Sequence, residues 1–275
     1  MRIAVIIPAA GSSTRFNDAG LGTRSKLDED LGGRPVLHRT VELFANYANP
    51  DPLELTDVGP IIVAGPHDDD AFAEFKLRHG DKLAILGVIL CKGGQTHRYE
   101  TVAAALKHVP ADATHIAVHD AARPCASTEL LDRVFRAART HAAVVPAVPV
   151  SDTIKRIEPE PLPDDAADPL AAILTDDAAT KKAESFAVRE TVKRDDLRAV
   201  QTPQVFEREL LQRAYSQDDL NSTDDAQLIE RLGERVVLVP GEPTNIKITV
   251  PTDLQLARTI LGVKPPKERP SHLKF

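Results

Sequence analysis

Short apolar runs alternate with amphipathic stretches along the first 150 residues of the chain. Residues 3–7 carry no polar side chain, which is typical of a strand buried on both faces of a parallel sheet. Residues 35–47 then place apolar side chains at helical spacing. We further expect strands at 59–64, 83–90, 115–119 and 142–150, and helices at 71–78, 100–108 and 128–140. This alternation predicts a doubly wound α/β sheet, mostly parallel, that binds ligands beyond the carboxyl ends of its strands.

The pattern changes between residues 158 and 179, which are acidic, contain no basic residue and hold four prolines. We expect an exposed loop or insertion there. Its only large apolar cluster is Leu170, Ile173 and Leu174, so deleting 158–179 is predicted to leave the fold intact. The elements expected after it are helices at 207–215, 225–232 and 252–261 and strands at 236–239 and 245–250. We expect one domain over residues 1–265 and a frayed tail over 266–275.

Composition narrows the class of protein. The formal net charge of −7 argues against a general nucleic-acid binder, which needs a basic surface. Cys91 and Cys125 have neither a CxxC partner nor a zinc-site spacing, so a reducing, cytoplasmic setting is expected. The apolar run at the N-terminus is too short to span a membrane and enters a glycine turn. No nucleic-acid or membrane partner is therefore expected.

The first candidate for chemistry follows the first strand. Pro8, Ala9, Ala10 and Gly11 are small residues that let the backbone approach a ligand, and successive N–H groups there could bind an anion. Arg15 and Lys26, further along, could neutralise phosphate charge. The segment contains neither GxGxxG nor a Walker GKS/T motif. The alternative is an ordinary turn with basic residues at the surface.

Two further candidates are single charged residues. Asp120 ends an apolar strand, where it could hold Mg²⁺ or its water against nucleotide phosphates, or could instead cap a helix or pair with an arginine. Lys247 alternates with Ile246 and Ile248 and so points away from them, toward either a bound phosphate or solvent.

Taken in order, the motifs resemble the 2-C-methyl-D-erythritol 4-phosphate cytidylyltransferase family over about residues 2–262. The combination is specific, although no single motif is. The matching segments are PAAG at 8–11 with Arg15 and Lys26, GG at 93–94 with Arg98 and Thr101, HDAARP at 119–124, DTIKR at 152–156, TVKR at 191–194, TPQVF at 202–206, TDDA at 223–226 and NIKIT at 245–249. The resemblance implies a Rossmann-like nucleotidyltransferase fold with a projecting dimerisation arm at about 152–195, and hence a homodimer.

The resemblance also implies the activity and the site. CMP would pass from CTP to 2-C-methyl-D-erythritol 4-phosphate, with Mg²⁺ as cofactor and pyrophosphate released. Catalytic roles fall on Arg15, Lys26, Lys247 and Asp120, with Asp120 beside the metal. The nucleotide would be bound by Pro8, Ala9, Ala10, Gly11, Gly94 and Thr101. The acceptor would be bound by Thr153, Arg194 and Thr202, of which the first two would reach the site of the neighbouring subunit.

The residues themselves fit this chemistry. A phosphate monoester has a second pKa of about 6, so the nucleophile is already an anion at neutral pH and requires no general base. The sequence offers no evident His–acid or Ser–His pair, so catalysis must come from positioning and from countering the charge of the phosphoryl group. A dinucleotide-binding oxidoreductase fits poorly, because the first turn lacks the glycine fingerprint and no acidic residue closes the second strand.

Three departures from the family keep alternatives open. The segment between Arg15 and Lys26 is longer than usual, and Ser25-Lys26-Leu27-Asp28 replaces the usual Pro-Lys-Gln-Tyr. The stretch 157–191 is longer than the usual arm, and the loop from Gly94 to Thr101 is one residue longer. The alternatives are a cytidylyltransferase for ribitol 5-phosphate or another polyol phosphate, and a weakened nucleotide-binding homologue.

Overall fold

The computed structural model describes residues 1–21, 25–49, 56–162 and 184–265. It divides into two compact units, which are described separately: unit 1 comprises Met1–Val148 and Val200–Phe275, and unit 2 comprises Pro149–Ala199. The tail at 266–275 and residues 163–179 of the acidic stretch lie outside the described residues. No helix in the described part of the chain is both long enough and apolar enough to cross a membrane.

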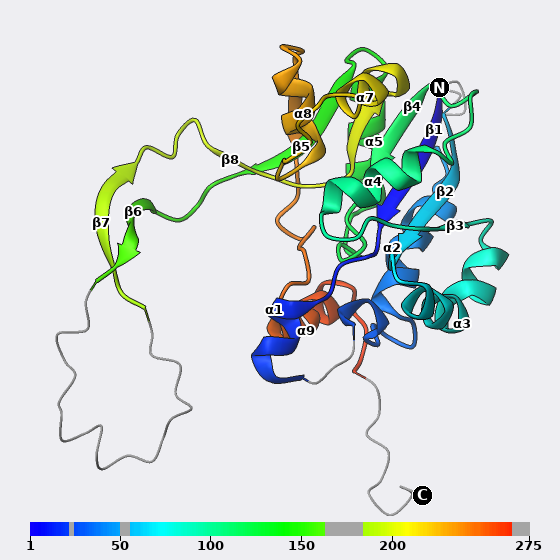
Figure 1. Ribbon diagram of the computed structural model, residues 1–275, viewed down its shortest axis with the longest axis horizontal. Coiled ribbons are helices and arrows are strands. Elements are labelled where there is room, and N and C mark those ends of the chain that lie inside the picture. The colour runs from blue at the N-terminus through cyan, green and yellow to red at the C-terminus, as the bar shows by residue number, and fades with distance from the viewer. Residues whose placement is uncertain (22–24, 50–55, 163–183, 266–275) are drawn as a thin grey trace, which may run out of the picture. The chain divides into compact units, whose positions relative to one another are not determined.

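Unit 1 is built on a central sheet with the strand order β10-β5-β9-β4-β1-β2-β3 (Figure 1). Its strands pair in parallel, except that β9 runs antiparallel to both β4 and β5. The predicted α/β sheet, mostly parallel, is therefore confirmed. The strands are β1 (Arg2–Pro8), β2 (Asp57–Gly65), β3 (Ile89–Lys92), β4 (His115–Val118), β5 (Ala143–Pro149), β9 (Gln204–Glu207) and β10 (Val237–Pro240).

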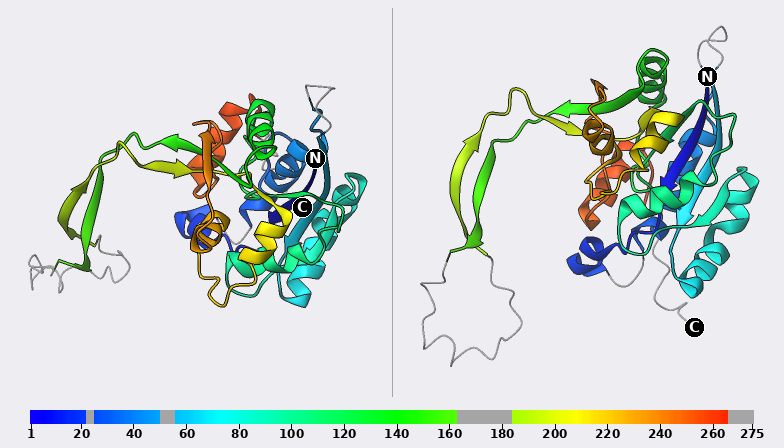
Figure 2. Two further views of the ribbon diagram at one scale, coloured as in Figure 1. Left: turned by 90° about the horizontal axis from the view of Figure 1, so that it is seen from above. Right: turned by 45° about the horizontal axis from the view of Figure 1, so that its top comes forward.

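Helices cover both faces of the sheet (Figure 2). Successive side chains of a strand point to opposite faces, so Ile3, Val5 and Ile7 of β1 join the core under α2, α3, α5 and α9, whereas Ile6 joins the core under α4, α7 and α8. The unbroken apolar run from Ile3 to Ile7 of β1 thus follows from burial on both faces. The helices are α2 (Val36–Ala45), α3 (Asp69–Ile85), α4 (Arg98–Leu106), α5 (Thr128–Ala138), α7 (Arg208–Ala214), α8 (Asp225–Arg231) and α9 (Pro251–Ile260), with the short turns α1 (Thr14–Phe16), η1 (Asn17–Leu21) and η2 (Lys26–Asp28).

Two predicted strands are wrong. Residues 83–90 were expected to form one strand, but α3 continues to Ile85 with Leu83 in its buried face, and β3 begins only at Ile89. Gly87, with φ of +70°, makes the turn between them, a conformation that glycine adopts without strain.

The second wrong prediction is the strand at 245–250. This segment makes isolated hydrogen bonds instead of the ladder of a strand. The Ile248 N–H donates to the Ala122 carbonyl at 2.8 Å, and the buried side-chain amide of Asn245 donates to the Thr202 carbonyl at 2.9 Å. The alternation of apolar side chains with Lys247 is real, but these tertiary partners, rather than a neighbouring strand, hold the backbone.

Unit 2 contains a two-stranded antiparallel ribbon of β6 (Ile154–Pro161) and β7 (Phe186–Val192). The next strand, β8 (Arg198–Val200), pairs with β5 in the large sheet. Lys155 lies opposite Thr191 in the register of the ribbon. Residues 158–161 are exposed, as expected for the predicted loop or insertion, but they are not a loop, because β6 runs through Pro161. A deletion that starts at residue 158 would thus remove part of a strand.

Candidate active site

A cavity of about 350 Å³ lies in unit 1, beyond the carboxyl ends of β1 and β4. This is where a doubly wound sheet is expected to bind its ligand. Of the predicted site residues, those that line it are Pro8, Ala9, Ala10, Gly11, Arg15, Lys26, Gly94, Thr101, Asp120 and Lys247. The structure therefore brings together residues as far apart in the sequence as Pro8 and Lys247.

The loop after β1 is anchored at its start and open toward the cavity. The Ala9 N–H donates to the Ala64 carbonyl at 2.7 Å, which continues the pairing of β1 with β2. A Cβ atom added at Gly11 would meet nothing within 4 Å, so the side facing the cavity is free of other protein atoms there. Ser13 has a φ of 58°, in the left-handed region that a non-glycine residue rarely adopts.

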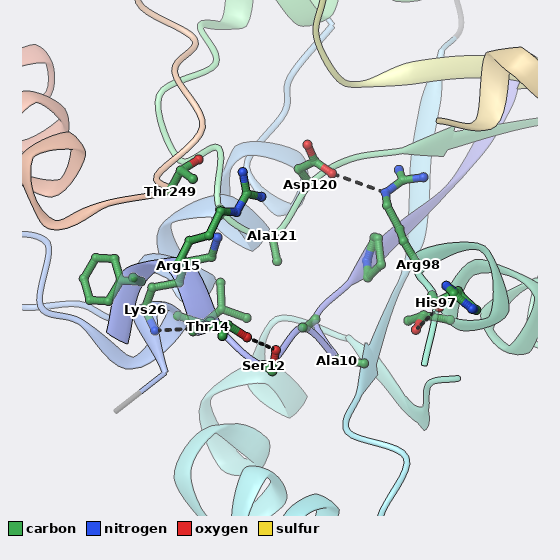
Figure 3. A pocket seen from close by; sticks show the side chains of 18 of the residues that line it. Ala10, Ser12, Thr14, Arg15, Lys26, His97, Arg98, Asp120, Ala121 and Thr249 are labelled. Atoms are coloured by element: carbon green, nitrogen blue, oxygen red, sulfur yellow. Dashed lines mark hydrogen bonds and ion pairs between the residues drawn. The ribbon is translucent and has the colours of Figure 1, made fainter. Parts of the chain in front are cut away.

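Lys26 is delivered by the turn η2. The Ser25 hydroxyl accepts from the Leu27 N–H at 3.3 Å, and the Ser13 hydroxyl accepts from the Lys26 N–H at 3.2 Å. The Lys26 ammonium donates to the Ile248 carbonyl at 2.8 Å. Burial, followed by the charges of Lys247 and Arg15, lowers the pKa of Lys26. The pocket therefore gathers three cations in one region, of which Arg15 and Lys26 stand together in Figure 3.

Asp120 lies where several cations converge. Its carboxylate is 2.9 Å from Lys247 Nζ, 3.3 Å from Arg123 Nε and 3.5 Å from Arg98 Nε. Burial by itself raises the pKa of this carboxyl, but Lys247, Arg98 and Arg123 outweigh burial and hold the pKa well below its usual range. Asp120 is therefore an anion at neutral pH.

Arg98 joins the pocket to the interior. Its guanidinium contacts Asp120 on one side (Figure 3) and donates from Nη2 to Asp225 Oδ2 at 2.8 Å on the other. Asp225, at the start of α8, is fully buried and accepts a second hydrogen bond from the Tyr215 hydroxyl. Burial opposes the charge of Arg98, but Asp225 and Asp120 raise its pKa. Sequence reasoning placed Arg98 and Asp225 in motifs and gave neither a role.

The glycine pair at 93–94 permits a close approach to α4. A Cβ atom on Gly94 would lie 2.1 Å from Glu100 Cβ, and one on Gly93 would lie 2.7 Å from the Gly65 carbonyl oxygen. The Gly94 N–H donates to the Thr101 hydroxyl at 3.1 Å. The predicted nucleotide-binding residues Gly94 and Thr101 are thus in direct contact, at the N-terminal end of a helix that faces the cavity.

The three predicted acceptor-binding residues are not in the pocket lining. Thr202 is 5% exposed; its hydroxyl accepts from the Asp120 N–H at 3.1 Å and lies 3.2 Å from His119 Nδ1. Burial lowers the pKa of His119 to about 4, so this imidazole is neutral at physiological pH. Thr153 and Arg194 belong to unit 2. Lining residues to which the sequence analysis gave no role include Ser13, His97 and Thr249.

The carboxylates of the pocket limit how a metal could bind. Among the described residues, no group of three or more His, Cys, Asp or Glu side chains could hold an ion, and Asp120 is the carboxylate in the lining. This fits Mg²⁺, which commonly binds through one or two carboxylates, water and the phosphates of a substrate. It does not fit a site made of protein ligands alone.

Comparisons with known proteins agree with the geometry. The sequence model of the 2-C-methyl-D-erythritol 4-phosphate cytidylyltransferase family matches residues 3–168 and 162–263. A protein of that name from Frankia casuarinae is 38% identical over 263 residues, which cover 95% of this chain and 82% of the relative. Its namesake from Rhodococcus jostii is 36% identical, over 94% of this chain and 95% of the relative.

A solved structure gives the same result. The crystal structure of 2-C-methyl-D-erythritol 4-phosphate cytidylyltransferase from Thermus thermophilus superimposes with a TM-score of 0.65 at 30% identity, covering 96% of this chain and all of that one. The nucleotidyltransferase fold expected from the resemblance is confirmed. With a pocket at the predicted edge of the sheet and relatives aligned over almost the whole length, the chain belongs to the 2-C-methyl-D-erythritol 4-phosphate cytidylyltransferase family.

Proposed function

We propose that this pocket transfers CMP from CTP to 2-C-methyl-D-erythritol 4-phosphate, giving 4-diphosphocytidyl-2-C-methyl-D-erythritol and pyrophosphate. The observation that carries the proposal is the set of cations around a single buried carboxylate. Lys26 and Lys247 line the cavity together with Arg15, and Lys247 contacts Asp120 at 2.9 Å. Such a site suits a polyanionic substrate whose reaction centre is a phosphorus atom.

In the reaction, an oxygen of the acceptor phosphate attacks the α-phosphorus of CTP. The new P–O bond forms as the bond from the α-phosphorus to the bridging oxygen breaks, and pyrophosphate leaves with that bond's electron pair. No proton has to be removed from the nucleophile, because a phosphate monoester is largely a dianion at neutral pH. The protein therefore has to align two anions that repel each other and to counter the charge that develops around phosphorus.

Different lining residues would bind the nucleotide and its phosphates. Pro8, Ala9, Ala10, Gly11, Gly94 and Thr101 form the small-residue wall against which the nucleotide would lie. Arg15 and Lys26 would bind the CTP phosphates, and Lys247 would contact the α-phosphate. The lowered pKa of Lys26 reflects burial beside other cations, which an incoming polyphosphate would relieve.

Mg²⁺ is the proposed cofactor. Asp120 would hold the ion or one of its waters, and the phosphates of CTP would supply the other ligands. When bound, the ion would add positive charge next to the reacting phosphates. Asp120 is suited to this because the surrounding cations keep its carboxylate ionised.

The acceptor site is proposed to be completed by a second copy of the chain. Thr153 and Arg194 both lie on the polypeptide of unit 2, and Thr202 lies behind Asp120, to whose N–H it is bonded. We propose a homodimer in which Thr153 and Arg194 of one copy bind the acceptor phosphate in the other copy's pocket. The buried, free thiols of Cys91 and Cys125 suit a cytoplasmic enzyme.

The test is pyrophosphate release from CTP and Mg²⁺ with each of two acceptors, 2-C-methyl-D-erythritol 4-phosphate and ribitol 5-phosphate. We expect release with the first acceptor alone. Removing one phosphate contact by Lys247→Ala should lower kcat about 100-fold. Arg133→Ala is the matched control, because Arg133 lies on α5 outside the pocket and should leave kcat unchanged.

Release with ribitol 5-phosphate alone would reassign the acceptor and keep the mechanism. If CTP bound and neither acceptor released pyrophosphate, the weakened nucleotide-binding homologue would replace the proposal.

A further inference from the structure

Two buried histidines and an aspartate form a hydrogen-bonded chain that links α2, α3 and η2. His79 on α3 lies with Nε2 at 2.7 Å from Asp28 Oδ1 and with Nδ1 at 3.1 Å from His38 Nε2 on α2. His79 and His38 are 2% and 4% exposed. The second oxygen of Asp28 accepts from Arg78 Nη1 at 2.6 Å. None of the three is in the pocket lining, although Asp28 lies only two residues after Lys26.

Asp28 fixes the direction of these bonds, because a carboxylate only accepts. His79 donates from Nε2 to the Asp28 carboxylate, and its Nδ1 accepts from His38 Nε2. Burial, followed by the neighbouring His79, lowers the pKa of His38 to about 4, so His38 is a neutral partner near pH 7. His79 also packs against Phe75, with ring centroids 4.9 Å apart, which fixes the ring further.

Asp28 connects the two histidines to the turn that carries Lys26. Asp28 is the last residue of η2, the single turn whose first residue is Lys26. A turn of three residues has little stability of its own and depends on its tertiary contacts. Ser13 holds the N–H of Lys26, and the buried Leu27 faces the core. Asp28 ties the far end of the turn to α3, so the direction of the Lys26 side chain depends on both ends.

We propose that His79, supported by His38, is a positioning residue for Lys26 and acts through the Asp28 carboxylate. The inference rests on the proposed role of Lys26 in binding the phosphates of CTP. His79 neither contacts the cavity nor has to exchange a proton with it; it holds η2 so that the Lys26 ammonium stays beside Lys247 and Arg15. Loss of this anchor leaves the Lys26 ammonium charged but lets it move away from the phosphates of CTP.

The experiment compares His79→Phe with His79→Gln. Phenylalanine keeps a ring of similar size among its aromatic neighbours and removes both hydrogen bonds, whereas a glutamine amide can again donate to Asp28. We expect His79→Phe to lower kcat/KM for CTP about 10-fold or more, and His79→Gln to recover most of that loss. Leu83→Ala is the matched control: Leu83 is buried one turn later on the same helix and has no bond to Asp28, so it should reduce stability without lowering kcat/KM.

A double-mutant cycle with Lys26→Ala separates positioning from general damage. If His79 acts through Lys26, the His79→Phe, Lys26→Ala double variant should be no slower than Lys26→Ala alone. Additive losses of kcat/KM, or full activity of His79→Phe beside an impaired Lys26→Ala, would overturn the inference and leave the proposed function standing. Full activity of Lys26→Ala would overturn both the role of Lys26 and the inference.

Hydrogen exchange tests the anchor without turnover. The amides of Leu27, Asp28 and Glu29 should exchange at least 10-fold faster in His79→Phe than in the wild type, and near the wild-type rate in His79→Gln. Because this measurement needs no acceptor, it holds even if the substrate assignment is wrong. Unchanged exchange in His79→Phe would overturn the inference.

Discussion

Arg98 connects Asp120 in the pocket to the buried Asp225. It contacts Asp120 at 3.5 Å and Asp225 at 2.8 Å, and Asp225 has no exposed surface. A buried ion pair adds little net stability, because desolvation offsets the attraction, but removal of one partner leaves a buried charge without compensation. The pair therefore acts to fix the guanidinium in place, which matters for the charge balance at Asp120.

The variant Asp225→Asn tests this. It should lower the free energy of unfolding by about 3 kcal/mol, because Arg98 loses its buried counter-charge, and it should also reduce kcat. Asp219→Asn is the control: Asp219 pairs with Arg231 at 3.4 Å with 74% of its side chain exposed, and its loss should cost less than about 1 kcal/mol. Urea denaturation measures both. Equal effects of the two variants would contradict the assigned role.

His119 makes stability depend on pH. Burial lowers its pKa to about 4, against 6.5 in the unfolded chain, so the unfolded state binds more protons between those values. Stability is then complete above about pH 6.5 and falls as the pH drops toward 4. Between pH 7 and pH 5 the loss from His119 should be about 2 kcal/mol.

Urea denaturation of the wild type and of His119→Gln at both pH values measures this contribution. Glutamine does not titrate, so the variant should lose less stability than the wild type on acidification. The same loss in both proteins would show that His119 is not the group responsible. His38, whose pKa burial also lowers to about 4, acts in the same direction in both proteins.

At the scale of elements, the approach of the 93–94 turn to α4 decides the shape of the nucleotide wall. A Cβ atom on Gly94 would lie 2.1 Å from Glu100 Cβ and 2.8 Å from the backbone nitrogen of Thr101, so the turn would have to move away from the helix. Gly11, in the loop after β1, has free space where its Cβ would be. The two glycines therefore differ in what they do for the protein.

Two substitutions use that difference. Gly94→Ala should lower the melting temperature and raise the KM for CTP, because the turn shifts. Gly11→Ala should leave the melting temperature unchanged and raise only the KM for CTP, because the added methyl group meets the ligand and no protein atom. Thermal unfolding and initial-rate kinetics check both variants. A stable Gly94→Ala protein with normal KM would contradict the close-packing argument.

At the scale of the whole molecule, unit 2 exposes an apolar pair that bears on assembly. In its ribbon, Ile157 of β6 lies opposite Val188 of β7, and the two are 45% and 57% exposed. An exposed apolar pair on a two-stranded ribbon is a surface that a partner would cover. Both the dimerisation arm at 152–195 and the single domain over 1–265 stay predictions.

Sedimentation at micromolar concentration tests the dimer. The wild type should sediment as a dimer, and the double variant Ile157→Asp, Val188→Asp as a monomer that binds CTP but has lost turnover of the acceptor, since Thr153 and Arg194 no longer reach a second pocket. Leu77→Asp, on the exposed face of α3 in unit 1, is the control and should remain a dimer. A monomeric wild type with full activity would refute the shared acceptor site.

Much of the fold could be predicted because its signals are local. A strand segment buried on both faces has to be apolar throughout, as residues 3–7 of β1 are; a helix on one face has to repeat its apolar positions, as α2 does. The pattern failed in two short segments, where tertiary contacts decided the structure. Leu83 lies in an apolar run yet belongs to α3, and Ile246 to Ile248 alternate without forming a strand.

By itself, therefore, the sequence determined the class of fold, the edge of the sheet that binds ligand, and the family. The spacing of apolar residues, the turn residues and the order of the motifs can all be read along the chain without knowledge of its folding. Only the tertiary structure decided that β9 enters the sheet antiparallel between β4 and β5, that Arg98 meets Asp225 across 127 positions, and that His79 reaches Asp28 across 51. These contacts join distant segments whose local patterns carry no information about each other, and their energies depend on burial that exists only once the chain has folded.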